Sequence, residues 1–264
     1  MGMLYQEPDF NRYNLLVNEY LIVRDADNTV VDLLAWTGEQ YRKVLYNEFD
    51  SMHFGKIKPF KDDPYQQLAY DSLVNNKISL IKGKAGSGKS LAALSYLFEL
   101  LEHHKIDKIL VFCNTVAAKG AAKLGFLPGD RTEKLMDSQI GNFLNSKIGD
   151  RTEVERLIQE EKLILLPVAD IRGYDTTGMR AGIYVTEAQN LSVSLMKLIL
   201  QRVGEDCFII LDGDMDCQVD LDEFEGRNNG MRRVSEVFRG QDFYGEVELQ
   251  IIHRSKIAAR ADLM

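Results

Sequence analysis

The residues with the clearest potential for chemistry form one short segment, Gly83-Lys84-Ala85-Gly86-Ser87-Gly88-Lys89-Ser90. Its spacing matches the phosphate-loop pattern G-x-x-x-x-G-K-[ST]. Glycines at these positions allow backbone N–H groups to turn toward phosphate oxygens, and a following helix adds partial positive charge at its N-terminus. We expect Lys89 to reach the β- and γ-phosphates of a nucleoside triphosphate, and Ser90 to place its hydroxyl on Mg²⁺.

The sequence on either side of this segment fits the same interpretation. Residues 78–81 are apolar and partly β-branched, as expected for a buried parallel strand. Residues 91–101 read as a strong helix, so the order is strand, glycine-rich loop, helix. A glycine-rich turn with a chance lysine is the alternative, and the flanking elements argue against it. The sequence therefore predicts that residues 83–90 bind a nucleotide.

A second group of candidate residues follows the strand-like run 182–185. Glu187 lies two residues beyond this run. A hydrolytic phosphate-loop enzyme needs a carboxylate beside the loop, which orients the attacking water and helps to hold Mg²⁺, partly through water. Glu187 fits that role. The alternative is a surface glutamate at a helix N-terminus, where the helix dipole favours it.

Two further candidates follow later strand-like runs. After residues 207–211, Gln218 could sense the γ-phosphate by hydrogen bonding while Asp214 anchors the loop; the alternative is an ordinary acidic turn. After residues 247–251, Arg254 could reach charge that develops on the γ-phosphate, in its own subunit or in a neighbour. A surface arginine is the alternative there.

The elements that must position these residues alternate from residue 65 onward. Apolar runs at 78–81, 108–113, 163–167, 182–185, 207–211 and 247–251 are separated by helical segments. This alternation predicts one doubly wound α/β domain with a mostly parallel sheet covered on both faces. In such sheets ligands bind at the carboxyl ends of the strands. We also expect helices over 133–147 and 152–160, each introduced by the pentapeptide Gly-Asp-Arg-Thr-Glu, with Asp150 and Glu153 at capping-box spacing.

The first 60 residues differ in character from the rest. Runs at 20–23 and 29–34 flank a turn-forming cluster, which predicts a β-hairpin. We expect residues 38–49 to be helical. This part is too small for an independent core, so we divide the chain into an extension, residues 1–60, that docks on a main domain, residues 61–264.

Composition narrows the class of protein. A net charge of −8 and a pI near 5.2 argue against coating nucleic acid through bulk charge. No apolar run approaches the roughly 20 residues that span a bilayer, and the N-terminus does not resemble a signal peptide. Cys113, Cys207 and Cys217 lack metal-ligand spacing and suggest inert thiols in a reducing compartment. We therefore expect a cytoplasmic protein without a membrane partner.

Taken together, these motifs resemble the PhoH-like family of P-loop ATPases, whose core is similar to that of superfamily 1 helicases. The resemblance runs from about residue 60 to the end of the chain. It rests on Gln66, the loop Gly83–Ser90, Leu124-Gly125-Phe126-Leu127-Pro128-Gly129-Asp130, Ile171-Arg172-Gly173, Glu187-Ala188-Gln189-Asn190, and Gly213-Asp214 with Gln218. It implies that Gln66 recognises adenine, so that ATP is the nucleotide.

The chain departs from the family pattern at several positions. The family usually has aspartate before the glutamate, where this chain has Thr186. That aspartate ordinarily helps to hold Mg²⁺ through water. The Thr186 hydroxyl could still contact a metal-bound water, and Asp214 or Asp212 could compensate for the missing carboxylate. Gln218 also lies one residue further from Gly213-Asp214 than the usual spacing. The short N-terminus leaves no room for the PIN-type nuclease domain of some relatives, and these features are similar to versions carried by bacteriophages.

The resemblance implies an Mg²⁺-dependent ATPase that forms a ring-shaped homo-oligomer and acts on single-stranded RNA, with unwinding as one outcome. In a ring, Arg254 would act across a subunit boundary. A different class of function is a nucleotide-dependent assembly or partner-binding module with little turnover. Thr186 favours that alternative, whereas Lys89, Ser90 and Glu187 favour the enzyme.

Overall fold

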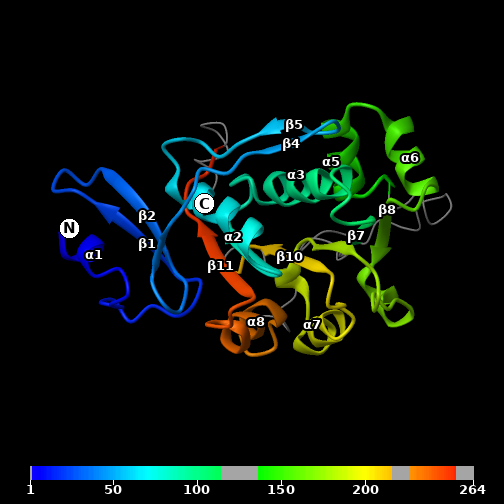
Figure 1. Ribbon diagram of the computed structural model, residues 1–264. Helices are drawn as coiled ribbons and strands as arrows, with labels where there is room; N and C mark the ends of the chain where they lie inside the picture. Colours follow the sequence, from blue (N-terminus) through cyan, green and yellow to red (C-terminus); the bar gives the residue numbers. More distant parts are fainter. Residues whose placement is uncertain (1, 114–135, 216–225, 254–264) are drawn as a thin grey trace, which may run out of the picture.

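The computed structural model describes residues 2–113, 136–215 and 226–253 (Figure 1). Their main feature is a six-stranded sheet with the order β11-β6-β10-β9-β7-β8, in which all neighbouring strands run parallel. The strands are β6 (Ile78–Gly83), β7 (Lys108–Cys113), β8 (Leu163–Pro167), β9 (Ala181–Val185), β10 (Phe208–Gly213) and β11 (Tyr244–Leu249). The predicted parallel α/β sheet is confirmed.

Helices cover both faces of this sheet (Figure 1). On one face lie α2 (Pro64–Asn75), α3 (Lys89–Glu102), α5 (Gln139–Ile148) and α6 (Arg151–Gln159). On the other lie α7 (Val193–Leu200), α8 (Gly230–Phe238) and the short 3₁₀ helix η1 (Val168–Gly173), while η2 (Ala188–Asn190) follows β9. The fold is therefore doubly wound, as predicted.

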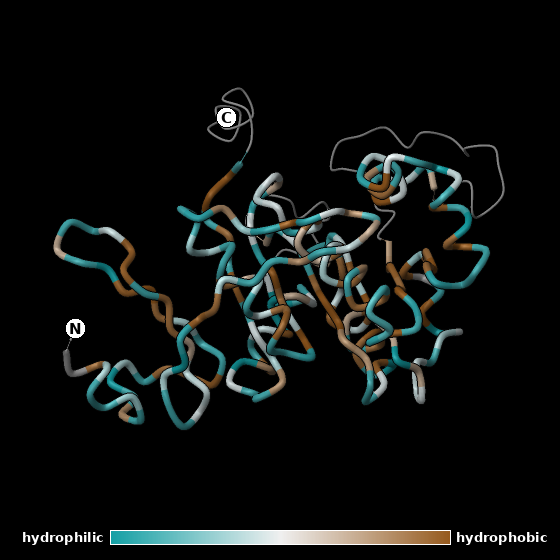
Figure 2. The backbone as a smooth tube through the Cα atoms, turned by 45° about the horizontal axis from the view of Figure 1, so that its top comes forward, coloured by the Kyte–Doolittle hydropathy of each residue, from teal (hydrophilic) through white to brown (hydrophobic). Residues whose placement is uncertain are grey.

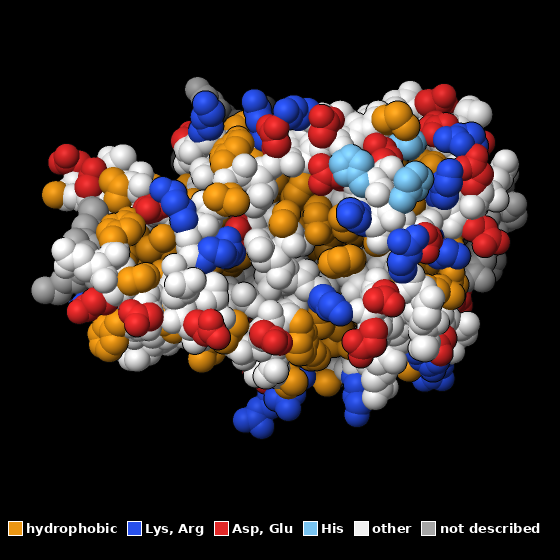
Figure 3. Space-filling view, in the orientation of Figure 1, with side chains coloured by type: hydrophobic (Ala, Val, Ile, Leu, Met, Phe, Trp, Pro, Cys, Tyr) orange, Lys and Arg blue, Asp and Glu red, His pale blue; other side chains and the backbone are white. Residues whose placement is uncertain are grey.

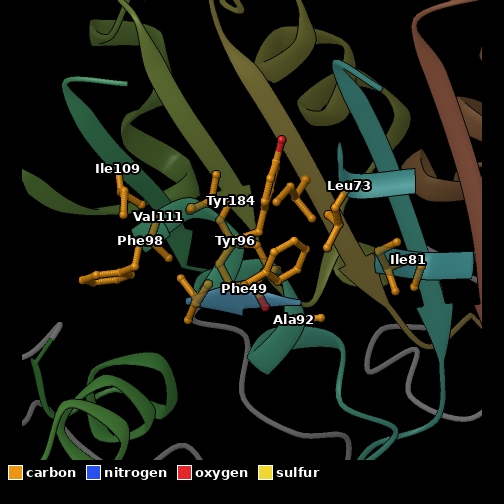
Figure 4. Close-up of a cluster of buried hydrophobic side chains, with 14 of the residues drawn as sticks. Phe49, Leu73, Ile81, Ala92, Tyr96, Phe98, Ile109, Val111 and Tyr184 are labelled. Atoms are coloured by element: carbon orange, nitrogen blue, oxygen red, sulfur yellow. The ribbon is translucent and has the colours of Figure 1, made fainter. Parts of the chain in front are cut away.

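The strands are apolar on both sides because both faces are covered. Leu80 and Ile81 of β6 are adjacent in sequence, point to opposite faces, and are both completely buried. Figure 2 shows hydrophobic segments concentrated in the central strands. Figure 4 shows the cluster on the α3 side, where Tyr184 of β9 lies among aliphatic and aromatic side chains from β6, β7 and the helices.

The N-terminal part contains the predicted hairpin, formed by β1 (Tyr20–Arg24) and β2 (Val30–Trp36). The predicted helix over 38–49 is wrong. The chain instead turns at Gly38, whose φ is 97°, and continues as β3 (Tyr41–Lys43), which pairs with β2. A second hairpin follows, made of β4 (Phe49–Ser51) and β5 (Gly55–Ile57), and a short helix, α1 (Gly2–Gln6), begins the described chain.

This N-terminal part shares the core of the sheet. Leu33, Val44 and Phe49 belong to the same buried cluster as α2 and α3. The Phe49 ring stacks on the Tyr70 ring of α2, with 4.6 Å between centroids and 3° between planes. A smaller cluster, built around Trp36 and Tyr41, lies further out. The extension therefore docks on the rest of the fold through its own buried side chains.

The two helices predicted after the second strand are present with shifted starts. α5 begins at Gln139, where Ser138 accepts a hydrogen bond from the N–H of Gly141. α6 is capped by Asp150, which accepts from the N–H of Thr152, while the Glu153 carboxylate contacts Arg156 and His53. Asp150 is confirmed as the cap of α6, whereas the Glu153 carboxylate bonds Arg156 and His53. The first pentapeptide, 129–133, lies outside the described residues.

Candidate nucleotide site

The glycine-rich segment Gly83–Ser90, here called the 83–90 loop, joins the end of β6 to the start of α3. Gly83, Gly86 and Gly88 have φ values of 143°, 84° and 99°, which are strained for residues with a side chain. A Cβ at Gly83 would also lie 2.7 Å from the carbonyl oxygen of Leu249. Glycine is thus required for the tight path that brings the backbone to the N-terminus of α3.

Lys89 and Ser87 hold the shape of the 83–90 loop. The Lys89 Nζ donates to the carbonyl oxygens of Gly83 at 2.5 Å and Lys84 at 3.1 Å. The Ser87 hydroxyl is buried and donates to the same Lys84 carbonyl at 2.8 Å, while Lys84 itself and Gly86 are exposed. The Lys89 ammonium is therefore held against the backbone of the loop, and its contact with phosphate oxygens stays a prediction.

Ser90, the next residue, contacts a carboxylate from the neighbouring strand. Its hydroxyl donates to Asp212 Oδ2 at 3.1 Å, and the Tyr184 hydroxyl donates to the same oxygen at 2.6 Å. The other oxygen, Oδ1, accepts from the N–H of Glu187 at 3.2 Å. Burial raises the pKa of Asp212, partly offset by the positive charge of Lys89 and by these hydrogen bonds. Burial and the Asp212 carboxylate also raise the pKa of Tyr184, so its hydroxyl stays protonated and donates.

Glu187 lies at the carboxyl end of β9, one strand beyond β10. It adopts a left-handed backbone conformation, with φ 54° and ψ 40°, which is rare outside glycine, asparagine and aspartate and is often found at functional sites. Its Oε2 accepts a hydrogen bond from Gln189 Nε2 at 2.6 Å. Gln189 is completely buried, and its Oε1 accepts from the N–H of Asp214 at 3.2 Å. Gln189 therefore links Glu187 to the end of β10.

A cavity of about 640 Å³ adjoins the 83–90 loop. Gln66 lies in its wall and spans two segments: its Oε1 accepts from the N–H of Phe60 at 3.1 Å, and its Nε2 donates to the carbonyl oxygen of Ser87 at 3.0 Å. A primary amide has two donors and two acceptor positions, so one of each is left over in this arrangement. The rest of the lining includes Tyr46, Ile57, Pro59, Phe60, Tyr70, Gly88, Leu91, Leu249 and His253.

The sequence did not single out the aromatic part of this wall. The Phe60 ring, half exposed, stacks on the ring of His253, with centroids 4.1 Å apart, and His253 Nε2 lies 2.7 Å from Asp63 Oδ2. Asp63 is buried and also caps α2. Sequence proximity gives a partial signal, because Phe60 and Asp63 lie within six residues of Gln66, whereas His253 is 190 residues from Asp63.

The remaining predicted residues have mixed outcomes. Ser90, Lys89 and Glu187 are brought to one edge of the sheet, whereas Gln218, Arg254 and the 124–130 motif lie outside the described residues. Arg172 is exposed in η1, after the edge strand β8. The described chain contains no set of three or more His, Cys, Asp or Glu residues arranged to bind a metal. Cys113 and Cys207 are buried, and burial raises the pKa of Cys113 to about 12.

Several exposed lysine and arginine side chains are paired with acids. Lys56 Nζ lies 2.5 Å from Glu48, and Arg233 lies 2.8 Å from Glu236. On the face shown in Figure 3, lysine and arginine side chains alternate with aspartate and glutamate. Across the ranges that the structure describes, no helix is long and apolar enough to cross a bilayer.

The parallel sheet, the 83–90 loop after β6 and the polar residues at the neighbouring strand ends define a P-loop NTPase, a class that binds nucleotides. The chain belongs to the PhoH-like protein family, whose family model matches residues 57–263.

Individual relatives agree with this assignment. The chain is 30% identical to Protein PhoH2 of Bacillus subtilis over 97% of its own length and 58% of that protein. It is 30% identical to Protein PhoH of Escherichia coli K12 over 64% of its length and 48% of that protein. The chain thus spans about half the length of the curated relatives it matches. Among solved structures, a KaiC-like protein of Pyrococcus horikoshii OT3 aligns with a TM-score of 0.33 and 12% identity, covering 58% of this chain and 68% of that one.

Proposed function

We propose that this protein hydrolyses ATP in a Mg²⁺-dependent reaction. The observation that carries the proposal is the meeting of Ser90, Asp212 and Glu187 at one edge of the sheet, beside the 83–90 loop. Hydroxyl and carboxylate oxygens are the ligands that Mg²⁺ prefers, and a bound nucleotide contributes phosphate oxygens and leaves room for water. The residues present therefore fit a magnesium–nucleotide complex.

In the proposed reaction, different residues of the chain bind the phosphates, orient the water and hold the adenine ring. Lys89 and the N–H groups of the 83–90 loop bind the β- and γ-phosphates. Glu187 orients a water molecule toward the γ-phosphate and accepts its proton. When bound, Mg²⁺ offsets the charge that develops on the phosphoryl group. In this proposal Gln218 and Arg254 contact the γ-phosphate, and Gln66 and Phe60 hold the adenine ring in the adjoining cavity.

Phosphate release in the presence of Mg²⁺ tests this proposal. Wild type should hydrolyse ATP. Lys89→Ala removes charge stabilisation and Glu187→Gln removes the general base, so each should reduce kcat by about 100-fold or more. Glu187→Gln should still bind ATP, because the 83–90 loop is intact. Glu39→Gln is the control, because Glu39 is exposed and distant in sequence from both the 83–90 loop and Glu187. Equal rates for wild type and Glu187→Gln would contradict the role of Glu187.

The proposal extends to partners that the family resemblance implies: a homo-oligomeric ring, single-stranded RNA and a cytoplasmic location. Its support is the 187–190 motif together with the family match. Single-stranded RNA is expected to raise ATP turnover, and light scattering is expected to give a mass several times that of one chain. An unchanged rate with RNA present would remove RNA from the proposal without affecting ATP hydrolysis.

The second candidate function is an ATP-dependent assembly module with little turnover. It is favoured by Thr186, which places a hydroxyl where the family has a carboxylate. In that case ATP would bind and change the oligomeric mass, and wild type and Glu187→Gln would release phosphate equally slowly.

A further inference from the structure

The candidate site holds a carboxylate in a different place from the one that the family pattern implies. The residue before Glu187 is Thr186, which carries no charge. In P-loop proteins the magnesium ion is held by the loop serine or threonine together with an aspartate from a nearby strand. The question is which residue of this chain supplies that carboxylate.

The register of β9 and β10 indicates which residue supplies the carboxylate. Leu211 of β10 pairs with Val185 of β9 in a parallel ladder, so the next residues along, Asp212 and Thr186, lie at the same level on adjacent strands. Neighbouring strands are about 4.8 Å apart. Because β10 lies between β9 and β6, a carboxylate at position 212 is one strand nearer to the 83–90 loop than a carboxylate at position 186.

The contacts of Asp212 match the role. Its carboxylate accepts hydrogen bonds from the Ser90 hydroxyl, the Tyr184 hydroxyl and the N–H of Glu187. One group therefore touches both the serine that would hold the metal and the residue proposed to orient the attacking water. A carboxylate has about four lone-pair positions, so three donors leave one for a metal-bound water or the metal itself.

The burial and the charge of Asp212 also favour a role in metal binding. Asp212 is only 2% exposed, and the one cation named as acting on it, Lys89, donates to the carbonyl oxygens of Gly83 and Lys84. Buried carboxylates are paired with a cation or coordinate a metal, because an isolated buried charge is costly. By contrast, Asp71, a buried aspartate of α2, has its cation: Arg42 Nη2 lies 2.6 Å from Asp71 Oδ2.

We propose that Asp212, in place of a carboxylate at position 186, holds Mg²⁺ beside Ser90. Compared with the family pattern, this chain has a threonine at the end of β9, at position 186, and carries the metal-binding carboxylate on the neighbouring strand β10, at position 212. The proposal rests on the proposed function, because it requires a magnesium–nucleotide complex at the 83–90 loop.

Binding measurements test it without requiring turnover. The affinity for ADP and for a non-hydrolysable ATP analogue would be measured by calorimetry in Mg²⁺ and in EDTA. In wild type, Mg²⁺ should tighten binding. Asp212→Asn should reduce that gain by about 10- to 100-fold while leaving affinity in EDTA unchanged, as found when metal-supporting carboxylates are removed. Asp71→Asn, which also removes a buried carboxylate, should keep the full gain.

The exchange itself provides the second variant. Thr186→Asp combined with Asp212→Thr returns the carboxylate to the family position and should restore the gain from Mg²⁺. Should Asp212→Asn fail to fold by circular dichroism, Asp212→Thr is compared with this double variant. A gain that is lost in Asp212→Thr and restored in the double variant supports the proposal; a gain that Asp212→Thr keeps, or that the double variant fails to restore, overturns it. A folded Asp212→Asn with the wild-type gain would also overturn it. Wild type that binds neither nucleotide would refute the proposed function itself, a different result from failure of Asp212 alone.

Discussion

Gly213 shows how closely the residues of the site are fitted to one another. A Cβ at this position would lie 2.3 Å from Gln189 Oε1 and 2.8 Å from the Met231 sulfur. Gln189 has no room to withdraw, since it is completely buried and links Glu187 to Asp214. The need for glycine here is a matter of close approach, not of backbone conformation.

Replacing this glycine should therefore disturb both stability and chemistry. Gly213→Ala is expected to lower the free energy of unfolding by about 1–3 kcal/mol through overpacking. It should also reduce ATP hydrolysis by up to about 100-fold, because displacing Gln189 moves Glu187. Urea unfolding and phosphate release measure the two effects. Gly173→Ala, where a Cβ meets nothing within 4 Å, is the control and should stay within about 0.5 kcal/mol of wild type.

Motif spacing predicts some residues of the site and not others. Lys89, Ser90 and Glu187 were predicted because a glycine-rich loop and a strand-end carboxylate can be recognised locally. The contacts among Ser90, Asp212 and Tyr184 depend on which strands are neighbours and in what register, and neither is encoded in local spacing. Tyr184 in particular lies in an apolar run that predicts only a buried strand.

The elements were predictable where their apolar pattern was complete. The strand predicted at 247–251 in fact spans Tyr244–Leu249. Its first half contains Glu246, which obscured the pattern; in the structure this carboxylate pairs with Lys82 of the adjacent β6 at 2.6 Å. A charge inside a strand is tolerated there because its partner lies on the neighbouring strand, which a single stretch of sequence does not reveal.

The wrong helix at 38–49 has a related cause. Tyr41, Val44, Leu45 and Phe49 have the i, i+3, i+4, i+8 spacing of one helical face. In the structure, however, Leu45 is 65% exposed while the other three are buried. The segment is held by long-range partners instead: Tyr41 pairs with Trp36 of β2, and Phe49 packs on α2 and α3. Tertiary contacts override the local pattern in such short strands.

The β4–β5 hairpin should accordingly depend on Phe49. Phe49→Ala is expected to lower the free energy of unfolding by about 3–5 kcal/mol, since this ring is 1% exposed and stacks on Tyr70. Chemical denaturation measures the loss. Met52→Ala changes a side chain of the same hairpin that is 88% exposed, and should have almost no effect. Similar losses for the two variants would show that the hairpin is not anchored through Phe49.

The same hairpin is joined to α6 by a contact that depends on pH. Hydrogen bonds from Arg156, and then from His53, lower the pKa of Glu153 to about 2. An unfolded glutamate has a pKa of about 4.3, so the contribution of Glu153 to stability is complete above that pH and is lost as the pH falls toward about 2. The difference in free energy of unfolding between wild type and Glu153→Gln should therefore shrink as the pH falls. Urea unfolding at several values between about pH 6 and about pH 3, a range that spans the unfolded pKa, measures it.

Glu155→Gln is the control for that experiment. Glu155 lies on the same helix and pairs with Arg151, so its replacement leaves the contacts of Glu153 with His53 and Arg156 in place. A difference between wild type and Glu153→Gln that stays constant across the range would contradict the assignment.

At the scale of the whole molecule, the question is whether the first 60 residues are an addition or a part of the fold. The predicted boundary at residue 60 rests on a change in sequence character, and the family match begins at residue 57. Yet Leu33, Val44 and Phe49 lie in the cluster that packs α2 and α3 on the sheet. Asn18 also donates hydrogen bonds to the carbonyl oxygens of Asp242 and Tyr244, beside β11. Composition cannot reveal such docking, because it depends on surfaces distant in sequence.

We therefore expect a fragment of residues 61–264 not to fold on its own. Removing the extension would expose the apolar surfaces of α2 and α3 and would take away the part of the cavity wall that Tyr46 and Phe60 form. Near-ultraviolet circular dichroism and thermal melting should show no cooperative transition for this fragment. A fragment that begins at Tyr13 removes α1 but keeps both hairpins, and should melt cooperatively at a somewhat lower temperature than the full chain. If residues 61–264 instead melted like the full chain and bound ATP equally well, the extension would be a separate unit, and Phe60 and Tyr46 would have no part in holding the nucleotide.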